Sequence, residues 1–218
     1  MKQAIILANG VPPRKSFLQA YLRLGDILIC ADGGANTAAR FNITPDLIIG
    51  DMDSVSTVTL QRFRSVTRKK ITSQNSTDLE KALAAAVRLR CTDAIVLGAT
   101  GGRLDHAMGN LSALAKYSPR LHIQFIDELG EYMYIGRKLE IDIPNGTTIS
   151  LLPLSVCTGI TTQGLQWNLH DEALQLGVRE STSNRAIAQK VHIQVHKGDL
   201  ILFILRIPME ASTKKSRK

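Results

Sequence analysis

Two aspartates separated by one residue, Asp51 and Asp53, stand directly after an apolar run at residues 48–50. In an extended segment, residues i and i+2 point to the same side, roughly 6 to 7 Å apart. Two carboxylates at that separation repel each other unless solvent or a cation balances them, and a hard cation such as Mg²⁺, with phosphate oxygens as further ligands, is a natural balance. The alternative is that both aspartates end a strand and stabilise the next turn.

The same arrangement, an apolar run that ends in glycine and a carboxylate, recurs along the first half of the chain. Residues 27–31 lead into the glycine-rich segment 32–36, and residues 94–98 lead into the glycine-rich segment 99–106. A further segment at residues 76–81 has the composition of a helix start. In open α/β sheets, ligands bind outside the carboxyl ends of the strands, so segments that are distant in sequence can converge there. We therefore predict a nucleotide site.

The glycine pairs in these segments suit a polyphosphate. Gly33-Gly34 and Gly101-Gly102 each precede a predicted helix, whose N-terminus attracts anions, and the missing Cβ lets backbone amides approach phosphate. Asn36 and Thr100 offer side-chain hydrogen bonds to the same ligand. Asp32 is a candidate for shaping this pocket, and stabilisation of a tight turn would explain it nearly as well.

Two cations and a further acid stand at the predicted helix starts. Asp78 lies in a first helical turn, where it suits either metal binding or capping of the helix beside Thr77. Lys81 shares its helical face and could reach phosphate oxygens or pair with Asp78. Arg103 could bridge two phosphate oxygens with its planar guanidinium, and the alternative is an ordinary surface arginine.

Composition limits the class of protein. With 218 residues and 44% hydrophobic content, the chain can form a packed core in one domain or two small ones. Its cysteines, Cys30, Cys91 and Cys157, are odd in number and widely spaced, which argues against a disulfide framework or a zinc site and favours a reducing, cytoplasmic compartment. We expect no signal peptide and no membrane span, because the apolar run at residues 4–8 is short.

The formal charge of +8 is concentrated in residues 62–70 and in the terminal residues 214–218. Charge alone does not discriminate between a nucleic-acid partner and a small polyphosphate that a positive field steers to its site. The aromatic content is 5%, and no stripe of interleaved basic and aromatic residues is present, so we expect no nucleic-acid partner.

The periodicity of apolar residues changes near residue 130. Up to that point strand-like runs alternate with helical patterns, which predicts a mainly parallel, Rossmann-like sheet in an α/β domain. Beyond it, short strand-like segments predict an all-β antiparallel sandwich. We expect domains at residues 1–130 and 131–209, followed by a basic disordered tail at residues 210–218. The expected helices are residues 16–24, 35–41, 57–63, 77–90 and 104–116; the expected strands of the second half are residues 132–135, 139–143, 147–152, 159–162, 190–195 and 200–206.

Six motifs, taken together and in order, resemble the thiamine pyrophosphokinase family. They are residues 32–36, 45–54, 77–81, 98–106, 164–169 and 181–184, and the resemblance covers nearly the whole chain except the basic tail. It implies an α/β ATP-binding catalytic domain, a β-sandwich that binds thiamine and dimerises, and a homodimer with active sites at the subunit interface. The implied reaction transfers the pyrophosphoryl group of ATP to thiamine with Mg²⁺, giving thiamine diphosphate and AMP.

The resemblance also implies roles for particular residues. Trp167, which would otherwise be assigned to a core, becomes the aromatic surface for thiamine, beside Ser183 and Asn184 on the partner subunit's side. Asp105 becomes a contact for thiamine or for Arg103, and His106 is left out of the catalytic set. The expected metal ligands are Asp51, Asp53 and Asp78; the expected catalytic residues are these three with Lys81 and Arg103; the expected ATP contacts are Asp32, Gly33, Gly34, Asn36, Thr100, Gly101, Gly102 and Arg103; the expected thiamine contacts are Asp78, Asp105, Trp167, Ser183 and Asn184.

Two positions depart from the family pattern. The family commonly has another acidic residue shortly before the Thr-Asp pair, where this chain has Gln74 and Asn75, which weakens the case for a second metal position and leaves the number of metal ions open. Many members have proline after the aromatic residue, where Asn168 stands here. Two other functions stay open: a related pyrophosphokinase for another hydroxyalkyl heterocycle, and a nucleotide-binding regulatory module without turnover.

Overall fold

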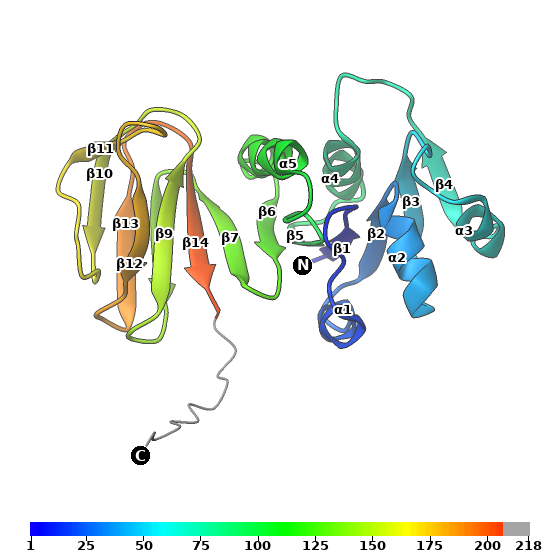
Figure 1. The fold of residues 1–218 in the computed structure, drawn as a ribbon, viewed down its shortest axis with the longest axis horizontal. Coiled ribbons are helices and arrows are strands. Elements are labelled where there is room, and N and C mark those ends of the chain that lie inside the picture. Colours follow the sequence, from blue (N-terminus) through cyan, green and yellow to red (C-terminus); the bar gives the residue numbers. More distant parts are fainter. Residues whose placement is uncertain (207–218) are drawn as a thin grey trace, which may run out of the picture.

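The computed structural model describes residues 1–206, and the predicted basic tail at residues 210–218 lies outside the described residues. Its first half is built on six parallel strands in the order β6-β5-β1-β2-β3-β4 (Figure 1). The strands are β1(Gln3–Leu7), β2(Ile27–Ala31), β3(Leu47–Gly50), β4(Thr67–Lys70), β5(Asp93–Leu97) and β6(His122–Ile126). The helices are α1(Lys15–Leu22), α2(Gly34–Phe41), α3(Thr57–Arg62), α4(Asp78–Arg88) and α5(Leu104–Tyr117).

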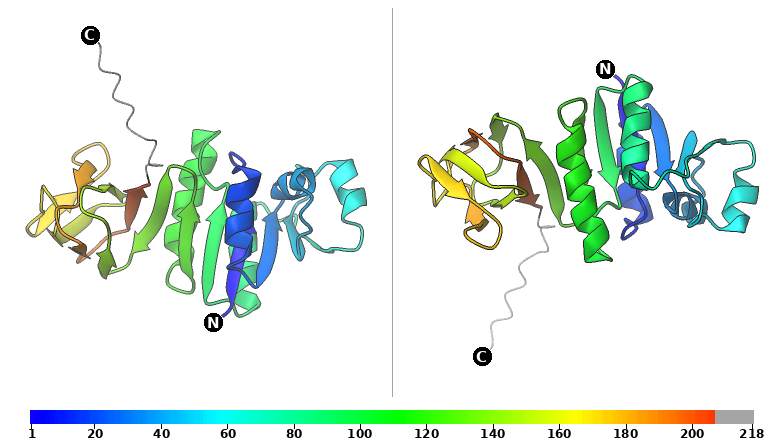
Figure 2. Two further views of the ribbon diagram at one scale, coloured as in Figure 1. Left: turned by 90° about the horizontal axis from the view of Figure 1, so that it is seen from below. Right: turned by 90° about the horizontal axis from the view of Figure 1, so that it is seen from above.

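Helices cover both faces of this sheet (Figure 2). Alternate residues of β1 enter opposite cores: Ile6 packs with α4 and α5, whereas Ile5 and Leu7 pack with α1 and α2. Strands buried on both faces read as continuous apolar runs, and this is the pattern that β1, β2, β3 and β5 carry in the sequence.

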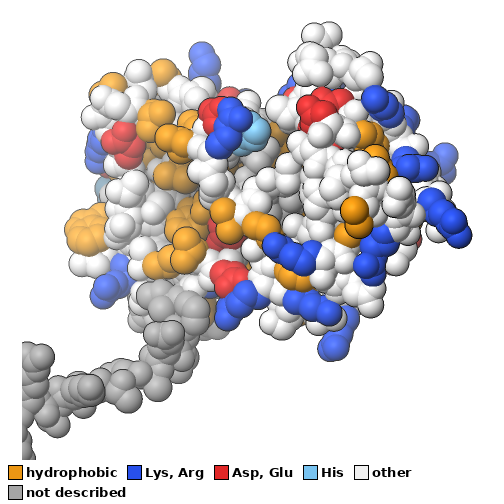
Figure 3. Space-filling model, turned by 45° about the vertical axis from the view of Figure 1, so that its right-hand side comes forward, with side chains coloured by type: hydrophobic (Ala, Val, Ile, Leu, Met, Phe, Trp, Pro, Cys, Tyr) orange, Lys and Arg blue, Asp and Glu red, His pale blue; other side chains and the backbone are white. Residues whose placement is uncertain are grey.

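The edge strand β4 was not among the expected strands. Its residues, Thr67–Lys70, are charged or polar and exposed, so the sequence has no apolar signal for them. Lysine and arginine on an edge strand discourage pairing with other chains. In the space-filling view, Lys and Arg side chains are frequent on the right-hand side, which is the α/β half (Figure 3).

The second half continues the same sheet before it forms a sandwich. β7(Gly130–Ile135) pairs antiparallel with β6, and the sheet runs on to ten strands. A separate four-stranded sheet covers its far end, and residues such as Leu151, Leu202 and Ile193 fill the space between the two. The added strands are β14(Leu200–Leu205), β9(Thr148–Pro153) and β12(Ser181–Arg185) in the long sheet, and β11(Glu172–Leu174), β10(Cys157–Gln163), β13(Lys190–Gln194) and β8(Lys138–Asp142) in the short one.

The predicted fold class is therefore confirmed: an α/β sheet with helices, followed by an antiparallel β-sandwich. In the second half, the short strand β11 and the polar strand β12 lacked the apolar pattern that identified the other strands. The domain boundaries stay a prediction, since β6 and β7 are hydrogen-bonded neighbours and one sheet crosses residue 130. Within residues 1–206, no helix has the length and apolar character needed to cross a membrane.

The order of the parallel strands reverses at the centre of the α/β half. The chain starts at β1, builds β2, β3 and β4 to one side, and returns through α4 to place β5 on the other side. Open α/β sheets bind ligands at such a switch point, outside the carboxyl ends of the strands. Here the loops after β1 and β5 meet, because the N–H of Gly10 donates to the carbonyl of Gly98 at 2.7 Å.

Candidate functional site

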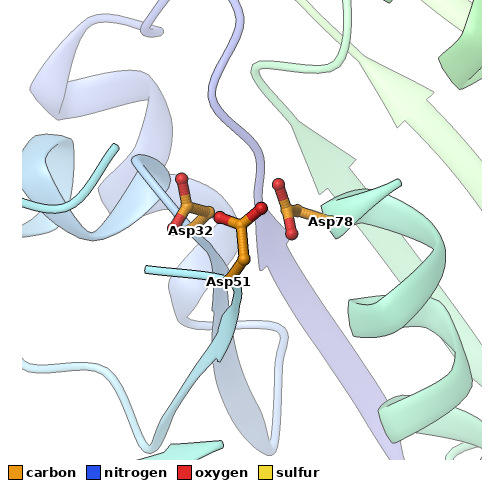
Figure 4. Close-up of side chains that lie close together, drawn as sticks. All are labelled: Asp32, Asp51 and Asp78. Atoms are coloured by element: carbon orange, nitrogen blue, oxygen red, sulfur yellow. The ribbon is translucent and has the colours of Figure 1, made fainter. Parts of the chain in front are cut away.

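Three carboxylates converge at the carboxyl edge of the parallel strands. Asp32 follows β2, Asp51 follows β3, and Asp78 is the first residue of α4; one oxygen from each lies within 4.8 Å of the others (Figure 4). Gly50 makes this approach possible, because a Cβ at that position would lie 2.8 Å from Asp32 Cβ and 3.0 Å from Asp78 Oδ1. We call these three residues the carboxylate cluster.

Asp32 is the buried member of the carboxylate cluster. Its side chain is 2% exposed, Oδ2 accepts a hydrogen bond from the N–H of Ser54 at 3.1 Å, and Oδ1 is buried without a partner among the described residues. Burial raises the pKa of Asp32, and the neighbouring carboxylates Asp78 and Asp51 raise it further. A buried carboxylate oxygen without a partner, beside two more carboxylates, fits a hard divalent cation.

Asp51 and Asp53 do not share one side of an extended segment, so that expected geometry is wrong. β3 ends at Gly50, and Met52 has a φ of +69°, which turns the chain between the two aspartates. The N–H of Asp53 donates to Asp51 Oδ1 at 3.2 Å, and the exposed Asp53 side chain accepts a hydrogen bond from Ser54 Oγ. Asp53 lies outside the carboxylate cluster, and its role as a metal ligand stays a prediction.

Asp51 is held as an ionised carboxylate. The N–H of Asp53 lowers the pKa of Asp51, burial opposes this, and the Gln74 amide and the Lys81 ammonium lower it further. Gln74 Nε2 lies 3.4 Å from Asp51 Oδ2, so a neutral amide approaches Asp51 from this segment.

Asp78 and Lys81 form an ion pair at the start of α4, with Lys81 Nζ 2.9 Å from Asp78 Oδ1 and the lysine only 4% exposed. The helix is capped by Thr77, whose hydroxyl accepts from the N–H of Glu80 while Glu80 accepts from the N–H of Thr77. The Asp78 carboxylate is therefore free of the capping role. Glu80 also forms an ion pair with Lys116 of α5, which links α4 to α5.

The segments at residues 32–36 and 98–106 follow β2 and β5 at the edge of the sheet that carries the carboxylate cluster, but not every residue in them is free to face a ligand. A Cβ on Gly34 would lie 2.0 Å from the carbonyl oxygen of Leu7, so this glycine is needed for the packing of α2 on β1. Asn36 holds the loop after β3, because its Nδ2 donates to the carbonyl of Ser54 and its Oδ1 accepts from the N–H of Ser56. Both ends of that amide are occupied.

Gly101 and Gly102 have φ values of +73° and +69°. L-residues other than glycine are strained in this left-handed region, so the two glycines set the shape of the loop before α5. A Cβ on Gly33 would lie 2.4 Å from Asn9 Nδ2, which places the side chain after β1 against the start of α2. Asn9 was not among the expected site residues, although an Asn-Gly pair directly after the first strand is a signal for a loop at this position.

Arg103 and Asp105 form an exposed ion pair at the start of α5. Arg103 Nε and Nη2 lie 3.1 and 2.5 Å from the two oxygens of Asp105, and the arginine side chain is 71% exposed. The Arg103 guanidinium lowers the pKa of Asp105 to about 2. Arg103 precedes the first turn without a side-chain capping bond, so its guanidinium is available to an anion that competes with Asp105. His106 is exposed beside them.

Trp167 lies in the sandwich half, on the loop between β10 and β11, and is 60% exposed, which excludes the core position. The backbone N–H of Trp167 donates to Asn184 Oδ1 at 3.2 Å, and Asn184 Nδ2 donates to the backbone carbonyl of Trp167 at 2.8 Å. Asn184 is 3% exposed, so a buried side chain fixes the backbone of the Trp167 loop through these two hydrogen bonds. Ser183, with a φ of +57°, is exposed beside a register shift between β12 and β9.

β3, which precedes Asp51, and β12, which binds the Trp167 loop, lie toward opposite ends of the long sheet (Figure 1). Trp167 is bound to β12, whereas Asp51 follows β3, and eight strand-to-strand steps separate β12 from β3. At about 4.8 Å a step, the separation is roughly 38 Å along the sheet. One chain therefore does not bring the two groups to a single small ligand.

The fold and the carboxylate cluster define a class: a doubly wound α/β domain with a candidate cation and nucleotide site at its switch point, joined through its sheet to a β-sandwich. Comparison with known proteins identifies the family. The family model described as "Thiamin pyrophosphokinase, catalytic domain" matches residues 18–125, and the one described as "Thiamin pyrophosphokinase, vitamin B1 binding domain" matches residues 137–200. The chain belongs to the thiamine pyrophosphokinase family.

Similarity to individual proteins extends along nearly the whole chain. Thiamine pyrophosphokinase 2 of Oryza sativa subsp. japonica is 32% identical over 224 residues, covering 88% of this chain and 82% of that protein. The crystal structure of thiamine pyrophosphokinase from Bacillus subtilis has a TM-score of 0.80 at 25% identity and covers 95% of this chain and 100% of that one. The fold is also that of thiamin pyrophosphokinase from Candida albicans, with a TM-score of 0.84 at 18% identity, covering 94% of this chain and 89% of that chain.

Proposed function

We propose that this protein is an enzyme that transfers the pyrophosphoryl group of ATP to the hydroxyethyl group of thiamine, giving thiamine diphosphate and AMP. The observation that carries the proposal is the convergence of Asp32, Asp51 and Asp78 beside the loops of the switch point. The matches to the catalytic and vitamin B1 binding family models, one on each half of the chain, support the choice of thiamine as acceptor.

Mg²⁺ is the proposed cofactor, held by the carboxylate cluster. The fit rests on the donor set, which is three carboxylates within 4.8 Å, and on the buried Oδ1 of Asp32 that has no partner among the described residues. The cation, when bound with ATP, neutralises charge on the triphosphate. The proposed ligands differ from the expected set of Asp51, Asp53 and Asp78, because Asp32 takes the third position. Whether Asp53 also binds the cation is left to experiment.

The other residues around the site have two proposed roles: they bind the phosphates of ATP and orient the hydroxyl of thiamine. Arg103 exchanges its contact with Asp105 for phosphate oxygens, since a bidentate guanidinium favours the more highly charged anion. The amides around Gly101 and Gly102, at the start of α5, receive phosphate. Lys81, buried against Asp78, fixes that carboxylate, which then orients the hydroxyl of thiamine toward the β-phosphorus.

We propose a homodimer in which each thiamine site joins the carboxylate cluster of one subunit to Trp167 of the other. The separation of about 38 Å along one chain supports this arrangement. Apolar side chains of the sandwich half, including Trp167, Leu176 and Val178, are 60%, 64% and 74% exposed. An exposed indole suits a flat cationic ring through stacking and cation–π attraction.

The activity test incubates the purified protein with ATP, Mg²⁺ and thiamine and identifies both products. Thiamine diphosphate and AMP in equal amounts are expected. ADP in place of AMP, or no thiamine diphosphate, contradicts the proposal, and parallel reactions with other hydroxyalkyl heterocycles test the related pyrophosphokinase.

Shared sites have a separate test, in which the inactive variants Asp51→Asn and Trp167→Ala are mixed one to one. Random reassortment makes half of the dimers hybrid, and each hybrid has one intact site if the site is shared, so roughly a quarter of wild-type activity returns. If each chain uses its own two residues, mixing restores nothing. Sedimentation of the wild type gives the oligomeric state directly.

A further inference from the structure

The loop between β5 and α5, residues 98–103, is held by side chains from outside it. Thr100 Oγ1 donates to Asp127 Oδ2 at 2.5 Å, and Asn110 Nδ2 donates to the carbonyl of Ala99 at 2.7 Å. The backbone of Thr100 is engaged as well, since its carbonyl accepts from the N–H of Val11 at 3.2 Å. Thr100 is therefore the residue through which two neighbouring segments fix this loop.

Asp127 is itself rigidly placed. It follows β6 directly, and its Oδ1 accepts the N–H groups of Leu129 and Gly130 at 2.8 and 2.9 Å, which closes the turn into β7. Burial, together with the nearby Asp127 carboxylate, raises the pKa of Tyr132 to about 12. The anchor of Thr100 thus belongs to the turn that joins the α/β half to the sandwich half.

The direction of the hydrogen bond decides what Thr100 can do. In the hydrogen bond between Thr100 and Asp127 the hydroxyl is the donor, so the single hydroxyl proton of Thr100 is directed at Asp127. Toward a phosphate, Thr100 Oγ1 then presents only lone pairs, and an acceptor facing an anion is repulsive. The expected hydrogen bond from the Thr100 side chain to ATP conflicts with this geometry.

We propose that Thr100 and Asp127 are positioning residues that hold the amides of Gly101 and Gly102 in the conformation that receives the phosphates of ATP. The inference rests on the proposed function, because it assigns the role of these residues to the ATP side of that site. The two glycines have left-handed φ values. Because glycine can adopt many other backbone conformations, contacts from outside the loop are needed to hold it in this one.

The test uses Thr100→Val, which keeps the shape and removes the hydroxyl, and Thr100→Ser, which restores it. A matched control is Thr147→Val, which removes a hydroxyl that donates to the carbonyl of Pro144 at 2.7 Å in the sandwich half. Hydrogen–deuterium exchange should rise in residues 98–103 for Thr100→Val alone. KM for ATP should rise about tenfold in the same variant with kcat changed less than about twofold, as expected for loss of one hydrogen bond to a charged group.

Asp127→Ala and the double variant separate positioning from direct contact. If Thr100 acts through Asp127, adding Thr100→Val to Asp127→Ala raises KM no further. An equal additional rise in that background means that Thr100 touches ATP and overturns the proposal. Unchanged exchange in Thr100→Val overturns it as well, whether or not the enzyme is active. Failure of the wild type to make thiamine diphosphate would instead remove the proposed function, and the exchange result would still decide whether Thr100 anchors the loop.

Discussion

Replacing Asp32 with asparagine should stabilise the metal-free protein and remove its response to Mg²⁺. The carboxylate is 2% exposed, one of its oxygens has no partner, and it faces Asp51 and Asp78. Asparagine has nearly the same shape, and it tolerates the left-handed backbone at this position, where φ is +44°. It can also keep the hydrogen bond from the N–H of Ser54. The substitution therefore removes mainly the charge.

The size of the effect follows from Coulomb's law. Two like charges 4.8 Å apart repel by about 3.5 kcal/mol at an effective dielectric constant of 20 and by about 0.9 kcal/mol in water. Asp51 and Asp78 are partly solvated, so each pair lies toward the lower figure, and a total near 2 kcal/mol is expected. For a chain of this length, about 2 kcal/mol corresponds to a rise in Tm of about 4 to 8 °C.

The assay is thermal unfolding of wild type and Asp32→Asn, each with a chelator and with excess Mg²⁺. Wild type should gain stability with Mg²⁺, whereas the variant should start higher and gain little, because one ligand has lost its charge. Asp171→Asn is a matched control, since Asp171 also has a left-handed backbone, with φ +56°, but is exposed and outside the carboxylate cluster. A lower Tm for Asp32→Asn in chelator, with the full response to Mg²⁺ retained, would refute the reasoning.

Three further outcomes are expected. Asp51→Asn should lower kcat at least about a hundredfold without lowering Tm, as steady-state kinetics would measure, because several kcal/mol of charge stabilisation are lost; turnover near the wild-type rate would exclude Asp51 from the cation site. Gly34→Ala should lower Tm by about 6 to 12 °C, since its Cβ would lie 2.0 Å from the carbonyl of Leu7 and about 3 kcal/mol of strain results. Burial alone would raise the pKa of Glu80, but the hydrogen bonds from Lys116 of α5 and from the N–H of Thr77 at the helix cap lower it below 4.5. The stabilisation of the folded protein by ionised Glu80 is therefore present above pH 4.5 and is lost on acidification. Glu80→Gln should therefore lower Tm by about 2 to 4 °C at pH 7, and the difference should shrink below pH 4.5.

The sequence predicted the elements that have a strong apolar period and missed those that do not. Strands β1, β2, β3 and β5 are continuous apolar runs, and the helices after them carry helical spacing, so both were identifiable. β4 reads as a charged run because an edge strand needs no apolar face. The expected strand at residues 159–162 proved longer, since β10 begins at Cys157 and ends at Gln163.

The sequence also predicted the outline of the candidate site, because its residues stand where predicted strands end and predicted helices begin. Strand ends and helix starts are visible in the sequence, so the positions of Asp32 and Asp51 after strands and of Asp78 at a helix start, all at one edge of the sheet, could be anticipated from parallel topology. The turn at Met52 could not, because a left-handed φ at a residue other than glycine depends on tertiary contacts. That turn separates Asp53 from the carboxylate cluster and leaves the third position to Asp32.

The continuity of the long sheet limits how a complete thiamine site can form. A hinge between the two halves would have to bend at the junction of β6 and β7, where three residue pairs are in register between Gln124 and Ile126 of one strand and Glu131 and Met133 of the other. The junction is also packed, because Tyr132, Tyr134 and Leu152 of the second half contact the core that α4 and α5 cover. Moving Trp167 toward the carboxylate cluster within one chain would break this ladder and expose that core. The association of two rigid chains leaves both the ladder and the core intact. We therefore expect mixing of the two variants to restore activity.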